Sequence, residues 1–131
     1  RQIEGLGGCK QSPLADLNGT LAAFARALFG SERKVRFRCD YFPSVEPGVD
    51  LSIDCIVCDG SGCRACKYTG WLEIMGAGMI HPQVLINGGV DHAEYSGLAF
   101  GMGPERLYLL RYGIEDIRLL YGDDLRCLQQ L

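Results

Sequence analysis

Short stretches in which apolar residues alternate with polar ones, or run together between glycines, predict a chain rich in β-strands. Within residues 34–41, Val35, Phe37 and Cys39 fall on one face and charged side chains on the other, the pattern of a half-buried strand. Residues 43–47, which begin and end with proline, are predicted to form a loop. The same reasoning predicts further strands at 2–8, 49–53, 71–75 and 98–102.

Apolar residues at helical spacing predict the longest helix over residues 17–29. Leu17, Leu21 and Leu28 share one face of this helix, and Asp16 is expected to cap its start. Further helices are predicted from Pro82 onward, over 104–112 with Gly113 as the stop, and around 115–121 and 123–130.

Strands that follow one another as hairpins, with helices collected late in the chain, indicate an α+β fold: an antiparallel sheet flanked by helices. The 131 residues are 47 % hydrophobic, which is enough for a packed core in one domain or in part of one. Because the chain starts at Arg1 without an initiator methionine, we expect residues 1–131 to be a C-terminal portion of a longer protein.

The charge balance limits the classes of partner. A net charge of −3 predicts no general attraction to nucleic acids or membranes, so any contact with a polyanion requires a local site. We find no signal peptide and no apolar run of membrane-spanning length, and we expect a cytoplasmic protein with no membrane partner. Three of the seven cysteines stand singly, which suits a reducing compartment.

The other four cysteines, Cys55, Cys58, Cys63 and Cys66, form two Cys-x-x-Cys pairs in the turn of a predicted hairpin. Tetrahedral Zn²⁺ takes four such ligands, and because four thiolates leave no position for water, the site would be structural. We therefore predict a four-cysteine zinc knuckle inserted at 55–66. Four reduced thiols, or one or two disulfides, remain as alternatives on spacing alone.

A second constellation lies at a predicted strand-to-helix junction. Gly101 and Gly103 allow a ligand to approach the backbone closely, and the helix start offers free N–H groups to an anion. The helix dipole favours Glu105 in the first turn and disfavours Arg106. Arg106 fits this position if it faces a bound phosphate, and its alternative is an ion pair with Glu105 or another surface acid.

Three further residues carry weaker signals. Phe42 is interpreted either as core or as the wall of an apolar pocket. Gln2 and Glu4 share one strand face, where they either meet solvent or hold an ammonium group. The sequence does not support a serine or cysteine nucleophile that is activated by a histidine.

Taken together, these residues resemble the bacterial phenylalanyl-tRNA synthetase α subunits, which are class II aminoacyl-tRNA synthetases. The resemblance runs along essentially all 131 residues, and some bacterial members also have a cysteine-rich hairpin. It is carried by Gln-Ile-Glu-Gly at 2–5, Lys-Val-Arg-Phe-Arg at 34–38, Tyr-Phe-Pro and Glu-Pro within 41–47, Gly-Trp-Leu-Glu-Ile and Gly-Ala-Gly-Met-Ile-His-Pro within 70–82, Ala-Phe-Gly-Met-Gly-Pro-Glu-Arg at 99–106, and Leu-Arg-Tyr-Gly-Ile-Glu-Asp-Ile-Arg at 110–118.

The resemblance implies the site and the reaction. Arg106 would be the motif 3 arginine that contacts ATP, and Phe42 would meet the substrate phenyl ring edge-on. Phenylalanine would be activated to its adenylate with ATP and Mg²⁺ and then transferred to tRNA(Phe). The implied ATP-binding set is Gly103, Glu105 and Arg106, and the implied amino-acid set is Gln2 and Glu4 for the ammonium end with Phe42, Ala99 and Gly101 for the ring.

The family also implies a synthetase β subunit in an (αβ)₂ heterotetramer. Residues 1–131 would span the second half of motif 2 to motif 3. Other site residues would lie upstream, and we expect the isolated chain to be inactive. The chain departs from the family at Ser44, where an aromatic residue is usual, which bears on amino-acid preference.

Two other functions compete with a catalytic one. A paralogue that kept the fold and the cysteines but lost catalysis would be a non-catalytic synthetase-like binding module. A chaperone-type cysteine-rich domain is suggested by Cys-x-x-Cys-x-Gly-x-Gly at 55–62, although that motif normally recurs and here occurs once.

Overall fold

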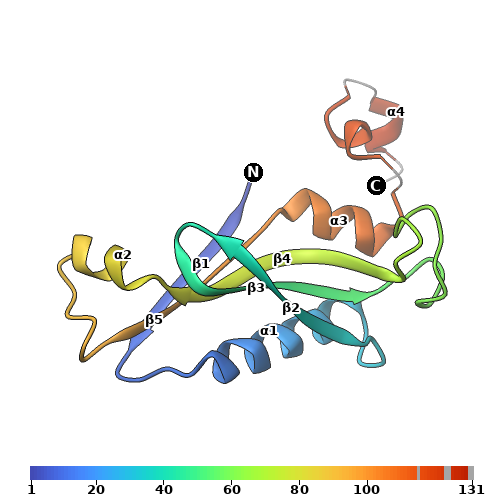
Figure 1. Cartoon of the computed structure of the whole chain (residues 1–131). Coiled ribbons are helices and arrows are strands. Elements are labelled where there is room, and N and C mark those ends of the chain that lie inside the picture. Colours follow the sequence, from blue (N-terminus) through green and yellow to red (C-terminus); the bar gives the residue numbers. More distant parts are fainter. Residues whose placement is uncertain (115, 123–124, 130–131) are drawn as a thin grey trace.

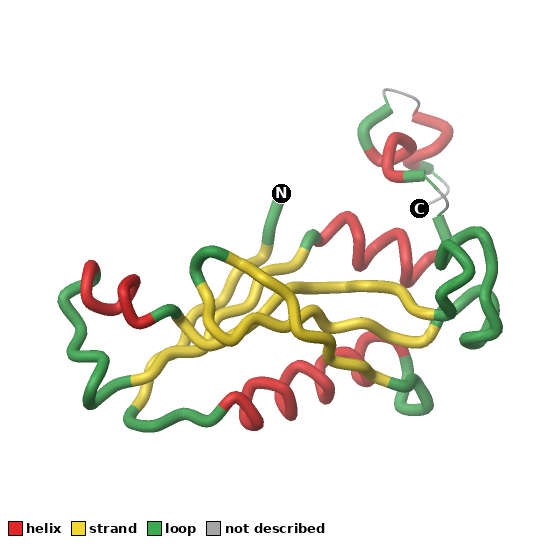
Figure 2. The backbone as a smooth tube through the Cα atoms, in the orientation of Figure 1, coloured by secondary structure: helices red, strands yellow, loops and turns green. Residues whose placement is uncertain are grey.

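Five strands form one antiparallel sheet in a computed structural model that describes residues 1–114, 116–122 and 125–129 (Figure 2). The order across the sheet is β1-β5-β4-β3-β2. The strands are β1 (Ile3–Cys9), β2 (Val35–Phe42), β3 (Val45–Asp54), β4 (Trp71–Ile80) and β5 (Ser96–Met102). The helices are α1 (Leu14–Phe29), α2 (Pro82–Asn87), α3 (Pro104–Tyr112), the 3₁₀ helix η1 (Ile117–Leu120) and α4 (Leu125–Leu128). The predicted α+β class is confirmed.

The core lies between α1 and the sheet (Figure 1). Leu51 and Ile53 of β3 are fully buried at its centre. Leu17 and Leu21 of α1 are buried against them, as the helical spacing predicts. This packing carries most of the helix's stability, because burial of an apolar face contributes more to a helix in a protein than the propensity of its residues.

The start of α1 differs from the prediction. The helix begins at Leu14, three residues before the predicted 17, and the residue that precedes it is Pro13. Asp16 therefore lies in the first turn rather than at the cap, and its N–H donates to the Pro13 carbonyl at 3.1 Å. A carboxylate in the first turn still interacts favourably with the helix dipole.

The predicted loop over 43–47 is wrong. Only Pro43 and Ser44 form the turn, and β3 already begins at Val45, so Pro47 lies inside a strand. The pairing of β3 with β4 is irregular between Val45 and Gly48, and this irregularity accommodates a residue that has no N–H to donate to a ladder.

Strand β4 extends five residues beyond the predicted 71–75, to Ile80. The added residues include Gly76 and Gly78, and because glycine has no side chain, this segment shows no alternation of apolar and polar side chains. A Cβ at Gly78 would come within 2.5 Å of the Pro47 carbonyl oxygen, so close strand packing requires glycine there.

Strand β2 follows its predicted pattern at one end only. Val35 and Phe37 pack against the core, whereas Cys39, expected on the same apolar face, is exposed. The core therefore packs against β2 only at its start, around Val35 and Phe37.

The C-terminal helices agree with prediction where they are described. Helix α3 ends at Gly113, which adopts a left-handed φ of +67° and is the predicted stop. Helices α2, η1 and α4 fall in the predicted regions, but η1 is a 3₁₀ helix. The predicted boundaries 115, 123 and 130 lie outside the described residues.

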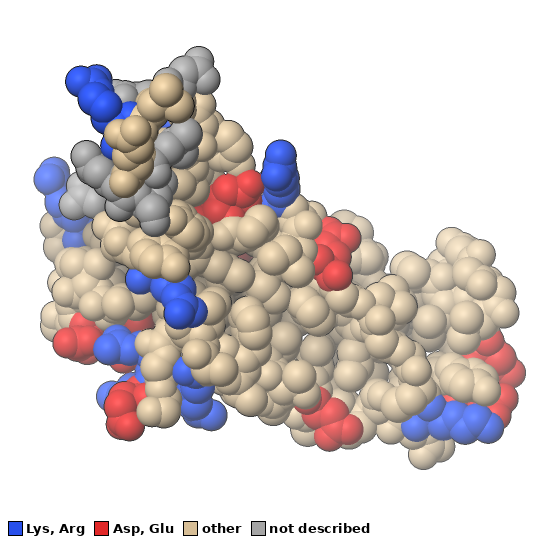
Figure 3. All heavy atoms as spheres, turned by 180° about the vertical axis from the view of Figure 1, so that it is seen from behind, with Lys and Arg blue, Asp and Glu red and all other residues tan. Residues whose placement is uncertain are grey.

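No helix within the described ranges is both long enough and apolar enough to cross a membrane. On the face seen from behind in Figure 3, basic and acidic side chains are interspersed around a wide uncharged area. The described residues of this face therefore carry charges of both signs, rather than the single-sign patch that attracts polyanions over distance.

Candidate functional site

A cavity of about 870 Å³ lies over β1, β5 and β4 and is bounded by the β2–β3 turn. It brings together residues from opposite ends of the chain, because β1 pairs with β5 and β5 pairs with β4. Seven of the residues predicted for substrate binding line it: Gln2, Glu4, Phe42, Ala99, Gly101, Gly103 and Arg106. Glu105, the eighth, does not line this cavity.

Small residues face one another beneath the cavity. Gly76 of β4 pairs with Gly101 of β5, and Gly78 pairs with Ala99. The Phe42 ring lies directly over this floor, since a Cβ at Gly76 would be 2.8 Å from its Cζ. The absence of large side chains at these paired positions leaves room for an apolar ring beside Phe42.

A polar edge adjoins this apolar floor. Gln2 and Glu4 are exposed, and Glu4 pairs with Gly101 across β1 and β5. A Cβ built on Gly101 would be 3.8 Å from the Glu4 Cγ, so the carboxylate side chain runs past the floor of the cavity. A cationic group placed over this floor would meet a carboxylate there.

The exposed Arg106 donates from Nε to the backbone carbonyl of Glu73 at 3.3 Å. Among the described residues, its predicted alternative pairing with Glu105 does not form. Glu105 instead accepts a hydrogen bond from the Tyr121 hydroxyl, which lowers the pKa of Glu105 and raises the pKa of Tyr121. The Arg106 guanidinium is thus oriented by a backbone group and keeps its charge for a ligand.

Helix α3 begins beside the cavity. Gly103 occupies its N-cap position, and this residue has no side chain to satisfy the first N–H groups of the helix. Its carbonyl accepts from Leu107 N at 3.2 Å, which starts the helix. Pro104 has no N–H to offer, so the Arg106 guanidinium and the positive end of the helix dipole make this corner of the cavity suitable for an anion such as a phosphate.

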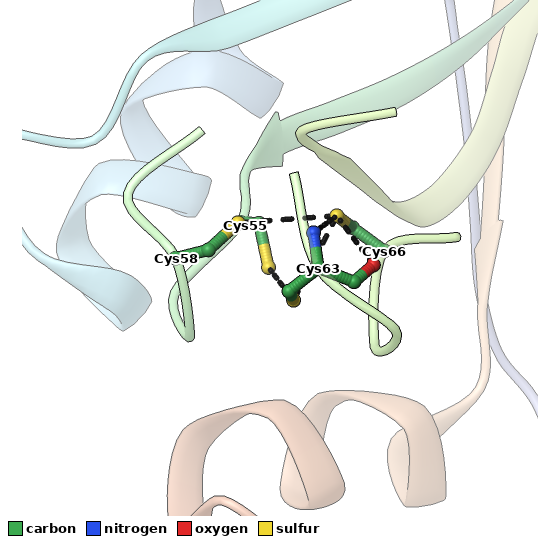
Figure 4. A group of neighbouring side chains, drawn as sticks. All are labelled: Cys55, Cys58, Cys63 and Cys66. Atoms are coloured by element: carbon green, nitrogen blue, oxygen red, sulfur yellow. Dashed lines mark hydrogen bonds between the residues drawn. The ribbon is translucent and has the colours of Figure 1, made fainter. Parts of the chain in front are cut away.

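The four cysteines of the knuckle lie at the far end of the β3–β4 hairpin, and their side chains point toward one another (Figure 4). All four sulfurs lie within 4.8 Å of one another. The Cys55–Cys63, Cys63–Cys66 and Cys58–Cys66 sulfur separations are 3.7, 3.8 and 3.9 Å. Tetrahedral Zn²⁺ with bonds of about 2.3 Å would place its sulfurs about 3.8 Å apart.

These separations far exceed a disulfide bond of about 2.05 Å, and the described cysteines are free thiols. The donor set and its spacing therefore fit one tetrahedral metal ion, and the fourfold thiolate set favours zinc.

Backbone groups prepare one of the sulfurs for this role. Burial acts to raise the pKa of Cys66, but the N–H groups of Cys63 and Gly70 donate to its sulfur and lower the pKa to about 6. Burial raises the pKa of Cys55 to about 12. A metal ion would be needed to hold all four as thiolates near neutral pH.

Positive φ angles allow the knuckle to fold back on itself. Gly60 and Gly70 have φ of +84° and +78°, and a Cβ at Gly70 would be 2.4 Å from the Gly60 carbonyl oxygen. The N–H of Cys55 donates to the Gly70 carbonyl at 2.8 Å and closes the base of the loop.

Two residues of the site were missed from the sequence. Glu73 contributes its backbone carbonyl to Arg106, which no side-chain pattern reveals. Gly76 sits under Phe42, and the Gly-Ala-Gly run that begins there was the signal for it. Ser44, the departure from the resembled family, also lines the cavity.

Comparisons with known proteins agree with this arrangement. The sequence profile described as "tRNA synthetases class II core domain (F)" matches residues 1–131. The phenylalanine–tRNA ligase α subunits of Herpetosiphon aurantiacus and Roseiflexus castenholzii are 58 % and 57 % identical over 98 % of this chain. That of Staphylococcus aureus is 54 % identical over the same share. The chain spans 37 % of the length of these relatives. It belongs to the class II tRNA synthetase core domain (F) family.

Proposed function

We propose that residues 1–131 form the part of a phenylalanine–tRNA ligase α subunit that runs from the second half of motif 2 to motif 3. The complete enzyme would activate phenylalanine with ATP to the adenylate and transfer the acyl group to tRNA(Phe). The supporting observation is the single cavity that joins the small-residue floor and Phe42 to Arg106. The names of the similar proteins support the same substrate.

In this proposal the floor recognises the phenyl ring. The ring of phenylalanine would lie above Ala99 and Gly101, with the edge of Phe42 against it, an arrangement worth about 0.5–1.5 kcal/mol beyond area burial. Glu4 would neutralise the ammonium group and Gln2 would accept a hydrogen bond from it. These contacts would direct the carboxylate group of the bound phenylalanine toward α3.

The anionic end of the site would hold ATP. Arg106, together with its backbone N–H in the first turn of α3, would stabilise charge that develops on the attacked α-phosphate. Glu105, which does not line the cavity, would belong to the ATP-binding set at the edge of this site. Mg²⁺ bound with ATP would neutralise phosphate charge. The residues supply positioning and charge, and the reaction needs no side-chain nucleophile.

The complete protein would be cytoplasmic and would work with a synthetase β subunit in an (αβ)₂ heterotetramer. The knuckle formed by Cys55, Cys58, Cys63 and Cys66 would hold one structural Zn²⁺. Because its four thiolates occupy every tetrahedral position, the ion would take no direct part in catalysis.

The test is phenylalanine-dependent ATP–pyrophosphate exchange by the full-length α subunit co-expressed with its β subunit. We expect exchange in the wild type and at least a tenfold loss of kcat/KM in Arg106→Ala. Arg111→Ala is the matched control, because Arg111 is another exposed arginine of α3 that donates to a backbone carbonyl, that of Leu28. Absence of exchange with phenylalanine and with aromatic analogues would favour the non-catalytic binding module.

A further inference from the structure

The carbonyl that holds Arg106 belongs to a part of β4 that β5 does not support. The β4–β5 ladder begins at the pair Met75–Met102, so Glu73 lies beyond it. On the other side, Glu73 pairs with Ser52 of β3. The position of the Glu73 backbone therefore depends on the β3–β4 hairpin.

This hairpin changes register next to Glu73. Leu51 pairs with Met75 and Ser52 pairs with Glu73, which leaves Ile74 as an extra residue on β4. Such a bulge bends its strand and redirects the groups beside it. The direction of the Glu73 carbonyl therefore depends on the position of the bulge along β4.

The knuckle connects the two strands at the turn end of the same hairpin. The last β3–β4 pair is Asp54–Trp71, and the next residues are Cys55 and Gly70, joined by the 2.8 Å hydrogen bond at the base of the loop. Cys55 is fully buried as part of the hydrophobic core. Only two residues, Trp71 and Leu72, separate this base from Glu73 along β4.

An ion pair also connects the knuckle to the end of β3. Arg33 contacts the carboxylates of Asp54 and Asp59 at 3.4 and 3.2 Å, and thereby joins the strand end to the knuckle loop. Asp59 is exposed, so this link by itself contributes little stability. The sulfur cluster joins both Cys-x-x-Cys pairs, and so closes the loop between Cys55 and Cys66 in addition to its backbone hydrogen bonds.

We propose that the knuckle, by binding a Zn²⁺-class ion, pins the β3–β4 hairpin in the register that directs the Glu73 carbonyl at Arg106. Glu73 is then a positioning residue for the ATP site, and metal occupancy sets the affinity for ATP. The floor of the phenylalanine pocket responds less to metal occupancy, because Gly76 and Gly78 of β4 are paired with residues of β5, whereas Glu73 is not. This inference rests on the proposed function.

The experiment uses the full-length α subunit with its β subunit and compares wild type with Cys58→Ser. Metal content is measured by mass spectrometry, and the KM values for ATP and phenylalanine by pyrophosphate exchange. We expect about one metal ion per chain in the wild type and loss of that ion in the variant. The KM for ATP should rise about tenfold, as for loss of one charged hydrogen bond, with less than a twofold change for phenylalanine.

A cycle with Arg106→Ala tests whether the effect passes through this residue. If the knuckle acts by positioning Arg106, Cys58→Ser should change the KM for ATP little in the Arg106→Ala background. Full additivity of the two changes would overturn the proposal. Cys9→Ser, at an exposed cysteine outside the knuckle, is the matched control and should leave metal content and both KM values unchanged.

Other results would also overturn it: wild-type protein without metal, or equal rises of both KM values. If Cys58→Ser does not fold, wild-type protein stripped with a zinc chelator and then refilled replaces it. If the wild type shows no exchange, the proposed function fails. The coupling is then tested by ATP calorimetry and by amide hydrogen exchange over β3 and β4, where unchanged ATP affinity and exchange after zinc removal would refute it.

Discussion

A methyl group added at Gly76 should disturb the amino-acid pocket. Its Cβ would lie 2.8, 3.2 and 3.4 Å from Cζ, Cε1 and Cε2 of Phe42. Carbon atoms in contact prefer about 3.5–4.0 Å, so the ring must move by about 1 Å. Overpacking of this kind costs about 1–3 kcal/mol, divided between folding and the placement of the ring.

The assay for Gly76→Ala is phenylalanine-dependent pyrophosphate exchange by the full-length enzyme, together with thermal unfolding. If the cost falls on ring placement, the KM for phenylalanine should rise about 5- to 150-fold, while the KM for ATP changes little. If it falls on folding, Tm should decrease.

Gly7→Ala is the control for this experiment. A Cβ at Gly7 would meet nothing within 4 Å, and Gly7 does not line the cavity. Wild-type KM for phenylalanine combined with wild-type Tm in Gly76→Ala would refute the placement of Phe42 against β4.

The remaining predictions concern the knuckle and the C-terminal segment. Gly70→Ala should lower the free energy of unfolding by about 1–3 kcal/mol in denaturant titration, since its Cβ would lie 2.4 Å from the Gly60 carbonyl oxygen. An unchanged denaturation midpoint would contradict this close approach of Gly70 to Gly60. Tyr121→Phe should raise the pKa of Glu105 in an NMR titration, because the hydroxyl stabilises the carboxylate; no change would exclude this hydrogen bond. The Arg118 guanidinium donates hydrogen bonds to the Asp116 carboxylate and lowers its pKa to about 2, so Arg118→Ala should return this pKa toward about 3.9 in an NMR titration. The Asp116 carboxylate then stabilises the fold above about pH 4 and loses this contribution as the pH falls toward 2; a normal pKa in the wild type would contradict it.

Local patterns were sufficient for much of the fold. Alternation predicted β2, helical spacing predicted α1 and α3, and Gly113 ended α3 as expected. The cysteine spacing predicted a four-sulfur cluster, which the structure contains. These features are local because each depends on residues within a few turns of one another.

Other features could not be predicted from local pattern. Pro47 lies within β3 because the pairing with β4 is irregular there, which the isolated segment does not reveal. Cys39 is exposed because the core packs against only the first part of β2, which alternation alone does not reveal. Glu105 does not pair with Arg106 among the described residues, because its carboxylate accepts a hydrogen bond from the hydroxyl of Tyr121, sixteen residues later.

The sequence by itself determined the strands, the longest helix, the cysteine knuckle and the candidate residues around Arg106. The family resemblance grouped Gln2 and Glu4 with residues about a hundred positions later, and the pairing of β1 with β5 is what brings them into one cavity. Only the tertiary structure decided that a backbone carbonyl orients Arg106. The physical reason is that hydrophobic periodicity records which face of an element is buried, whereas the pairing of distant strands and the position of a bulge depend on packing across the whole sheet.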